Sequence, residues 1–178
     1  PEAIHKVRLW MKQIDTFQQY TGPITYGIAV RKLQMNKSDE EKEADLQNIP
    51  DPVKRQARKE TMEKGIDAPI VMNSLRKAGD FLDQLEANIE DSGWIAGDKF
   101  SMADACTLPY IQRLDHLALS EAFSEEKRPK INKWYKKVKD LDFFDKAVTS
   151  QIPPPLVEMM NTFGEEVKEK ALNLMEEK

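Results

Sequence analysis

The sequence predicts an all-α protein, a bundle of about seven or eight helices, and two observations support this expectation. Apolar residues recur three or four positions apart through most of the chain, which is the spacing of a buried helical stripe. No segment has the alternating apolar and polar pattern of a half-buried strand, and no hairpin signal joins two such segments. The length of 178 residues suits one domain, which can bury roughly 70% of its unfolded surface.

The first predicted helix is amphipathic. Its apolar stripe consists of Ile4, Val7, Trp10, Met11, Ile14 and Phe17. Gly22-Pro23 interrupts this stripe, because proline lacks an amide donor and clashes with the preceding turn. We interpret the apolar run 24–33 as a kinked continuation or a second helix, with a short strand as the less favoured alternative.

Start and stop signals bound the next two helices. Ser38 and Glu41 have capping-box spacing within a strongly charged stretch, which predicts a short exposed helix. Asp51-Pro52 combines an N-cap with proline at the first helical position, and Gly65 is a typical residue after a helix end. A helix over about 52–64 is therefore expected.

Three longer helices should form the centre of the bundle. The first opens at 67–69 and ends near 92–93, the second covers 101–117 despite an internal proline, and the third covers 128–140. A short helical turn at 143–148 follows. Each of these segments carries apolar residues at helical spacing, so each is expected to bury one side.

The C-terminal segment 151–178 is predicted to be a proline-rich linker followed by one amphipathic helix. Pro153-Pro154-Pro155 favours an extended polyproline conformation. The helix beyond it has a stripe formed by Leu156, Met159, Met160, Phe163, Val167, Ala171 and Leu174. We expect this helix to pack on the bundle or on a neighbouring subunit.

Composition excludes several functional classes. The chain has 27 Lys plus Arg and 31 Asp plus Glu, a formal charge of −4, whereas nucleic-acid binding needs a basic face. No nucleic-acid partner is therefore expected. The longest apolar stretch, 24–30, is far shorter than the roughly twenty residues that span a membrane, so no membrane partner is expected either.

Cysteine and histidine are scarce. The single cysteine, Cys106, allows no internal disulfide and no cysteine-based zinc site, and it fits a reducing compartment such as the cytoplasm. Two histidines, His5 and His116, are too few for most metal sites. We expect no metal, and we interpret Cys106 as a small core residue because a buried thiol without cationic neighbours is a poor nucleophile.

The most informative segment runs from Gly93 to Ala105, with the sequence GWIAGDKFSMADA. Ser101 is placed to cap the next helix by accepting a hydrogen bond from the backbone N–H of Asp104. The carboxylate of Asp104 can in turn accept from the N–H of Ser101, which closes a capping box. Phe100 precedes the cap and has the position of a hydrophobic staple facing Ala105.

This segment closely resembles the C-terminal helical domain of cytosolic glutathione transferases, in which a W-hydrophobic-A-G-D-x-F-S-x-A-D segment links two helices. The resemblance continues in Pro109-Tyr110, in Arg113-Leu114-Asp115 and in the R-P-x-apolar-x-x-W pattern of 128–134. It covers about residues 1–150 and leaves out 151–178. A narrower resemblance, carried by 7–12, 24–29 and 49–52, is to the bacterial branch that includes lignin β-aryl etherases.

The resemblance implies a two-part enzyme. Family members place an N-terminal thioredoxin-like domain, which binds glutathione and activates its thiol, before this helical domain. No βαβ pattern is present in these residues, so the thiol-activating residue is expected outside this chain and no catalytic residue is assigned. Pro1 then reads as the start of the second domain of a longer protein rather than as a trimmed natural terminus.

By the same resemblance, the helical domain shapes a pocket for a hydrophobic electrophile. The candidate substrate-binding residues lie on the first helix and on the capped helix: Trp10, Gln13, Ile14, Phe17, Tyr20, Tyr110 and Arg113. Apolar spacing alone also fits burial of Trp10, Ile14 and Phe17 in the core, and Arg113 also fits a salt bridge. Asp115 and His116 are adjacent, point about 100° apart on a helix and do not form an acid–base pair.

Two functions remain open at this stage. The first is a cytoplasmic, dimeric glutathione transferase that conjugates hydrophobic electrophiles, or cleaves ethers, for detoxification. The second is a non-catalytic module that mediates protein assembly, since helical domains of this kind also occur in translation elongation factor subunits and synthetase complexes.

Overall fold

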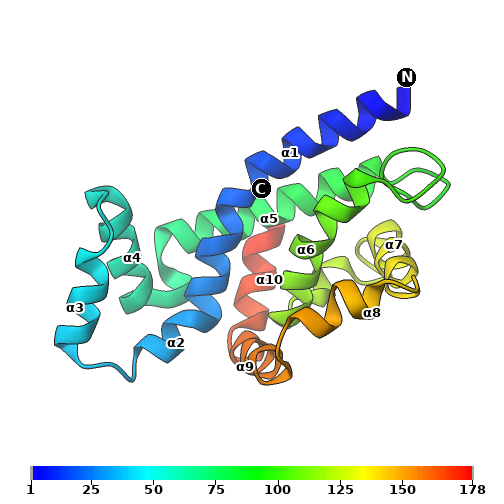
Figure 1. Cartoon of the computed structure of the whole chain (residues 1–178). Coiled ribbons are helices and arrows are strands. Elements are labelled where there is room, and N and C mark those ends of the chain that lie inside the picture. Colours follow the sequence, from blue (N-terminus) through cyan, green and yellow to red (C-terminus); the bar gives the residue numbers. More distant parts are fainter. Residues whose placement is uncertain (1, 178) are drawn as a thin grey trace.

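The computed structural model describes residues 2–177, and in that range it contains helices and no strand. The predicted all-α fold is confirmed. Pro1, which led us to expect an upstream domain, lies outside the described residues, as does Lys178. Figure 1 shows α5 (Pro69–Asn88) passing through the middle of the molecule, with the other helices arranged around it.

The first helical rod covers residues 2–34. Helix α1 (Glu2–Thr25) continues through Pro23 into a π-helical segment, Tyr26–Val30, and then into α2 (Arg31–Gln34). The strand alternative for 24–33 is therefore wrong, and Figure 1 shows that the rod bends partway along its length. Pro23 cannot donate to the carbonyl four residues earlier, and a bend at such a position is the usual result.

Helices α3 (Asp39–Gln47) and α4 (Pro52–Lys64) begin at the predicted signals. The Ser38–Glu41 capping box is present, and one carboxylate oxygen of Asp51 accepts from the N–H groups of Val53 and Lys54 at 2.8 and 3.2 Å. Gly65 ends α4 with φ +59°, in the left-handed region that favours glycine. Local capping chemistry thus predicted both helices correctly.

Helix α5 is the central element of the core. Its apolar residues include Val71, Leu75, Ala78, Leu82 and Leu85, all with no exposed surface. It ends at Asn88, four residues before the predicted stop, because the next residue, Ile89, is extended and buried. Burial of the Ile89 side chain in the core outweighs continuation of the helix to the glycine signal.

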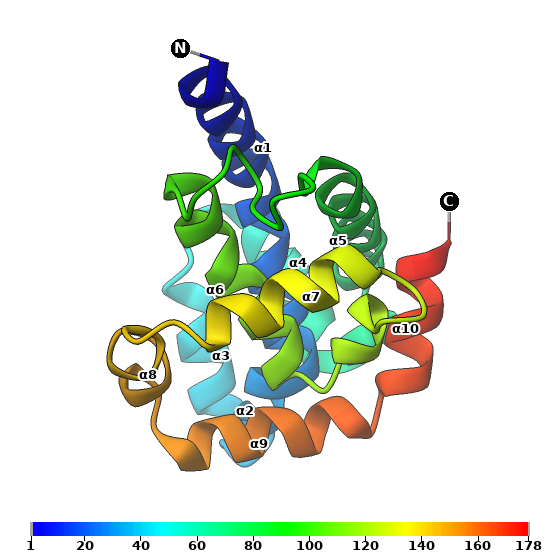
Figure 2. The same cartoon turned by 90° about the vertical axis from the view of Figure 1, so that its right-hand side faces the viewer.

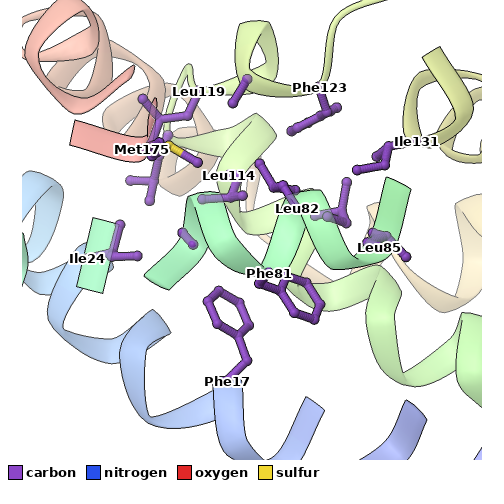
Figure 3. Close-up of a cluster of buried hydrophobic side chains, with 14 of the residues drawn as sticks. Phe17, Ile24, Phe81, Leu82, Leu85, Leu114, Leu119, Phe123, Ile131 and Met175 are labelled. Carbon is purple, nitrogen blue, oxygen red and sulfur yellow. The ribbon is translucent and has the colours of Figure 1, made fainter. Parts of the chain in front are cut away.

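Helix α6 (Met102–His116) packs beside α1, and α7 (Pro129–Lys139) crosses α5. Short 3₁₀ turns at Ser120–Phe123 and Thr149–Gln151 and the small helix α8 (Phe144–Ala147) connect these elements. Figure 3 shows side chains from several of these helices meeting around α5, with Phe17 facing Phe81 on one side and Met175 lying near Leu119 on the other.

The C-terminal segment differs from expectation in two respects. Pro154 and Pro155 are not extended but form the first turn of α9 (Pro154–Glu165), where the missing N–H groups of proline cost nothing. The single predicted helix is two, because the chain turns at Glu166 and Val167 before α10 (Lys168–Glu176) begins. Figure 2 shows α9 running along one edge of the bundle and α10 rising from its end.

The turn between α9 and α10 lets α10 lie along α5. Met160, Ala171, Leu172, Leu174 and Met175 are buried there and belong to the same hydrophobic core as the earlier helices. Of the predicted stripe, Leu156, in the first turn of α9, is instead 41% exposed.

Two glycines and one arginine allow this close packing. A Cβ atom on Gly79 of α5 would overlap the carbonyl of Met175 in α10, and one on Gly164 of α9 would overlap the carbonyl of Leu117. The buried guanidinium of Arg128 bridges the carboxylates of Asp83 and Glu176, at 2.8 and 3.3 Å. Backbone-to-backbone approach and a shielded ion-pair network therefore fix α9 and α10 on the bundle.

Candidate functional site

The predicted capping box forms at the start of α6 and is part of a larger network. The N–H and the hydroxyl of Ser101 donate to the carboxylate of Asp104 at 2.9 and 2.8 Å. The same carboxylate accepts from the N–H of Ile95 at 3.1 Å and from Nε1 of Trp134 at 2.9 Å. Asp104 has no exposed surface, so one buried carboxylate holds the preceding loop, the start of α6 and α7 together.

The ring of Phe100 packs edge-on against Trp94 and Phe143, with centroid separations of 5.6 and 5.3 Å. Trp94 precedes the capping box and Phe143 follows α7, so this aromatic cluster closes the same corner of the bundle that Asp104 holds by hydrogen bonds. These contacts hold the start of α6 against the loop before it and the residues that follow α7.

Three of the candidate pocket residues lie in the core. Trp10 and Ile14 are each only 3% exposed, and Nε1 of Trp10 donates to the hydroxyl of Thr107 at 2.7 Å. Phe17 is also buried and stacks on Phe81 with a centroid separation of 4.2 Å. Trp10 and Ile14 therefore join α1 to α5 and α6. Phe17 also lies at the edge of the groove between α1 and α5 that is described next.

The remaining candidates line two open grooves. The first, which we call the Gln13 groove, lies between α1 and α5 and has a volume of about 320 Å³. It is lined by Gln13, Thr16, Phe17, Tyr20, Lys77, Asp80, Phe81 and Gln84. It thus contains three of the predicted residues from the first helix.

The second groove, which we call the Arg113 groove, lies between the end of α1, the π-helical segment, α4 and α6, with a volume of about 420 Å³. It is lined by Thr21, Gly22, Thr25, Tyr26, Val30, Arg58, Pro109, Tyr110 and Arg113. The rings of Phe17 and Tyr110 meet edge-to-face, 5.7 Å apart. A residue that lines the first groove therefore touches a residue that lines the second.

Burial changes the ionisation of the two α6 residues. Loss of solvation raises the pKa of the Tyr110 phenol, and the negative charges of Asp15 and Cys106 add to the effect. Loss of solvation lowers the pKa of the half-buried Arg113 guanidinium. Nη1 of Arg113 contacts the sulfur of Met160 at 3.3 Å. At neutral pH Tyr110 is therefore a neutral hydrogen-bond donor and Arg113 remains a cation.

Asp115 and His116 do not form a pair with each other. Asp115 accepts from the hydroxyl of Tyr135 at 2.9 Å and from Nζ of Lys139 at 3.1 Å. Burial lowers the pKa of His116 most, and the positive charge of Arg113 lowers it further. Within residues 2–177, Nδ1 of His116 has no hydrogen-bond partner. Cys106 is half-buried and packs against the core.

Sequence reasoning missed two features of this region. The guanidinium of Arg58 lies 3.7 Å from the ring centroid of Tyr26. This contact joins α4 to the π-helical segment, and no local sequence pattern predicts it. A further cavity of about 590 Å³ lies between the end of α6 and α9, next to His116. It forms only because α9 folds back on the bundle, so its lining could not be found from spacing.

Within the range that the structure describes, no group of three or more His, Cys, Asp or Glu side chains could hold a metal ion. In the same range, no helix combines the length and the apolar character that crossing a membrane requires.

Comparison with known proteins identifies the family. No curated protein and no solved structure matches the chain. The family model for the glutathione S-transferase C-terminal domain matches residues 35–142, which is more than half of the chain. The match spans α3 to α7 and includes the Asp104 network described above. The chain therefore belongs to the glutathione S-transferase C-terminal domain family.

Proposed function

We propose that this chain is the substrate-pocket-forming half of a glutathione S-transferase that acts on hydrophobic electrophiles. An N-terminal thioredoxin-like domain would precede it in the working enzyme, bind glutathione and activate the thiol. Family membership supports the general assignment. The observation that carries the pocket assignment is the edge-to-face contact of Phe17 and Tyr110, through which a residue of α1 that lines one groove touches a residue of α6 that lines the other.

The chemistry divides between the two halves. Glutathione supplies the sulfur nucleophile, which attacks as the thiolate. The residues of this chain bind the electrophile and orient it, so that a bimolecular encounter becomes a reaction between neighbours. Aromatic surface from Phe17, Tyr20 and Tyr110 excludes water from one side of such a ligand, and the Tyr110 hydroxyl can donate a hydrogen bond to a polar substituent.

Rigid support is the second contribution of this chain. Asp104 fixes the start of α6, and the buried hydrogen bond from Trp10 to Thr107 fixes α1 against it. The relative position of Phe17 and Tyr110 is thereby set by the core and does not depend on a mobile loop. Trp10, Ile14, Ser101 and Asp104 act in this proposal as positioning residues, and Gln13, Tyr20, Tyr110 and Arg113 as candidate ligand contacts.

Three finer parts of the proposal come from the family resemblance. The enzyme would be a cytoplasmic homodimer, it would serve detoxification, and it would belong to the branch that includes lignin β-aryl etherases. In that branch the thiolate displaces an aryloxide from an ether carbon, so a C–S bond forms as the C–O bond breaks. An aryl-ether substrate would then compete with an aryl halide for the same pocket.

The test is steady-state kinetics of the complete polypeptide that contains this chain, with glutathione and 1-chloro-2,4-dinitrobenzene. Glutathione-dependent conjugation is expected. Tyr110→Ala should raise KM for the aryl halide severalfold and leave KM for glutathione unchanged, because in this proposal Tyr110 contacts the electrophile and the thioredoxin-like domain binds glutathione. Tyr135→Phe is the matched control, since Tyr135 lies on α7 and bonds Asp115 outside both grooves.

A different result would support the assembly-module alternative. If the complete polypeptide neither binds glutathione-agarose nor accelerates conjugation of several electrophiles, and instead co-purifies in fixed stoichiometry with a translation complex, the enzyme assignment is wrong.

A further inference from the structure

The Arg113 groove is positively charged although the chain as a whole is acidic. Of the described residues that line it, only Arg58 and Arg113 carry a charge, and no carboxylate lies among them. The rest of the lining is aromatic, aliphatic or hydroxylic. The chain has a formal charge of −4, and the charge of Asp15 acts on Tyr110 in this groove, but the lining itself carries two arginines and no carboxylate.

Arg113 lacks an acidic partner. Its guanidinium is half-buried, and among residues 2–177 the sulfur of Met160 is its one recorded polar contact. Removing a charged group from water is costly unless an opposite charge and hydrogen bonds replace the lost solvation. Loss of solvation accordingly lowers its pKa. An anionic ligand in the groove would supply the partner that the protein does not.

Arg58 is oriented without using its hydrogen-bond donors. Its guanidinium lies over the ring of Tyr26 at 3.7 Å, and no salt bridge to it is recorded within the described chain. Stacking on an aromatic face leaves the N–H groups at the edge of the guanidinium available for a planar acceptor. Tyr26 is itself only 8% exposed, so this stacked pair is a fixed part of the groove wall.

The backbone of the groove is also unusual. Tyr26–Val30 is π-helical, a conformation that is rare and often found at functional sites. Pro109 lies opposite, inside α6. The hydroxyls of Thr21 and Thr25 donate to backbone carbonyls at 2.8 and 2.9 Å, so they do not provide donors to a ligand. The positive charge available to an anion in this groove therefore comes from the two arginines.

We propose that the Arg113 groove binds an aromatic carboxylate, with the carboxylate paired to Arg113 and the ring packed against Tyr110 and Val30. Arg58 adds positive charge to the same groove. The planar carboxylate matches the two-pronged donor geometry of a guanidinium, and the apolar wall matches an aryl group. The inference rests on the proposed function and deepens it. It assigns aryl carboxylates as the class of compound that this groove selects, either as the electrophile or as its leaving group.

The experiment is isothermal titration calorimetry of the complete polypeptide with 2-naphthoate and with its neutral isostere 2-naphthamide. The two probes have nearly the same shape and differ in charge. The wild-type protein is expected to bind the carboxylate at least tenfold more tightly. Arg113→Gln should abolish this preference, Arg58→Gln should reduce it severalfold, and Arg8→Gln should leave it unchanged because Arg8 lies at the exposed end of α1.

Arg113→Lys protects the test against misfolding of the glutamine variant. It keeps the positive charge and loses the planar fork, so binding of 2-naphthoate should weaken severalfold while circular dichroism stays native. Equal affinity for the two probes, or a carboxylate preference that survives Arg113→Gln, would overturn the inference. Arginine-dependent naphthoate binding by a polypeptide without glutathione-transfer activity would instead refute the proposed function and leave the anion site standing.

Discussion

At the residue scale, one buried carboxylate holds the site together. Asp104 accepts hydrogen bonds from the backbone of Ile95 and Ser101 and from the indole of Trp134, and no solvent reaches it. Removal of one acceptor would therefore leave several buried donors without partners. Each such donor costs about 1–3 kcal/mol.

We predict that Asp104→Ala lowers the free energy of unfolding by about 3–5 kcal/mol, measured by urea denaturation. Asp98→Ala, in the exposed turn of the same loop, should change it by less than about 0.5 kcal/mol. Ser101→Ala should fall between them, at about 1 kcal/mol, since it removes only the cap hydroxyl. Equal effects of the two aspartate substitutions would show that the network carries no special stability.

His116 makes stability depend on pH at the same scale. Its pKa in the folded protein is lowered below 6.5 by burial first and by the charge of Arg113 second. The unfolded chain therefore binds a proton more readily, and folding stability should fall as the pH drops from about 6.5 toward the lower folded pKa. His116→Gln should flatten the stability profile in that window in urea titrations, whereas His5→Gln, at an exposed position, should not.

At the element scale, close backbone approach decides how the C-terminal helices pack. Helix α10 touches α5 at Gly79, where a Cβ atom would overlap the carbonyl of Met175. Alanine usually stabilises a helix relative to glycine by up to about 1 kcal/mol. At this position the overlap should reverse the sign of that effect.

We predict that Gly79→Ala destabilises the protein by about 2 kcal/mol and that Asn73→Ala, on the exposed side of the same helix, is neutral or slightly stabilising. Thermal unfolding of the two variants checks this. A melting temperature for Gly79→Ala at or above the wild-type value would mean that α10 does not lie against α5 in solution.

Truncation after Gln151 tests both C-terminal helices together. It would uncover the core surface now covered by Met160, Leu172, Leu174 and Met175, and large exposed apolar patches promote association. The truncated chain should melt at a lower temperature and should aggregate in size-exclusion chromatography with light scattering. An unchanged melting temperature and a monodisperse profile would contradict this packing.

Elements with local signals were predictable. Three helices begin at their predicted start signals, which are the capping boxes at Ser38 and Ser101 and the N-cap at Asp51-Pro52. These signals depend only on hydrogen bonds between residues close in the sequence. The prolines at 153–155 led to the wrong prediction of an extended segment, because consecutive prolines fit both an extended segment and the first turn of a helix. The turn at Val167 has no local marker, since the packing of α10 on α5 determines it.

At the scale of the whole molecule, the sequence predicts helical content and family better than it predicts the pocket. Helical spacing placed Trp10, Ile14 and Phe17 on one stripe but could not separate core from groove, because the same apolar residue serves either. The stacked pair of Arg58 and Tyr26 joins residues 32 positions apart through tertiary packing. Only the folded arrangement reveals that Arg58, which the sequence did not suggest, shares a groove with the candidate Arg113.

The most direct test of the central claim is a crystal structure of the complete polypeptide with S-benzylglutathione. We predict that the glutathione moiety binds to a thioredoxin-like domain and that the benzyl ring lies within about 4 Å of Tyr20, in the groove between α1 and α5, or of Tyr110, in the groove that α1 forms with α6. A benzyl ring seated on another face of the helical bundle, or a complete polypeptide without a thioredoxin-like domain, would contradict the account.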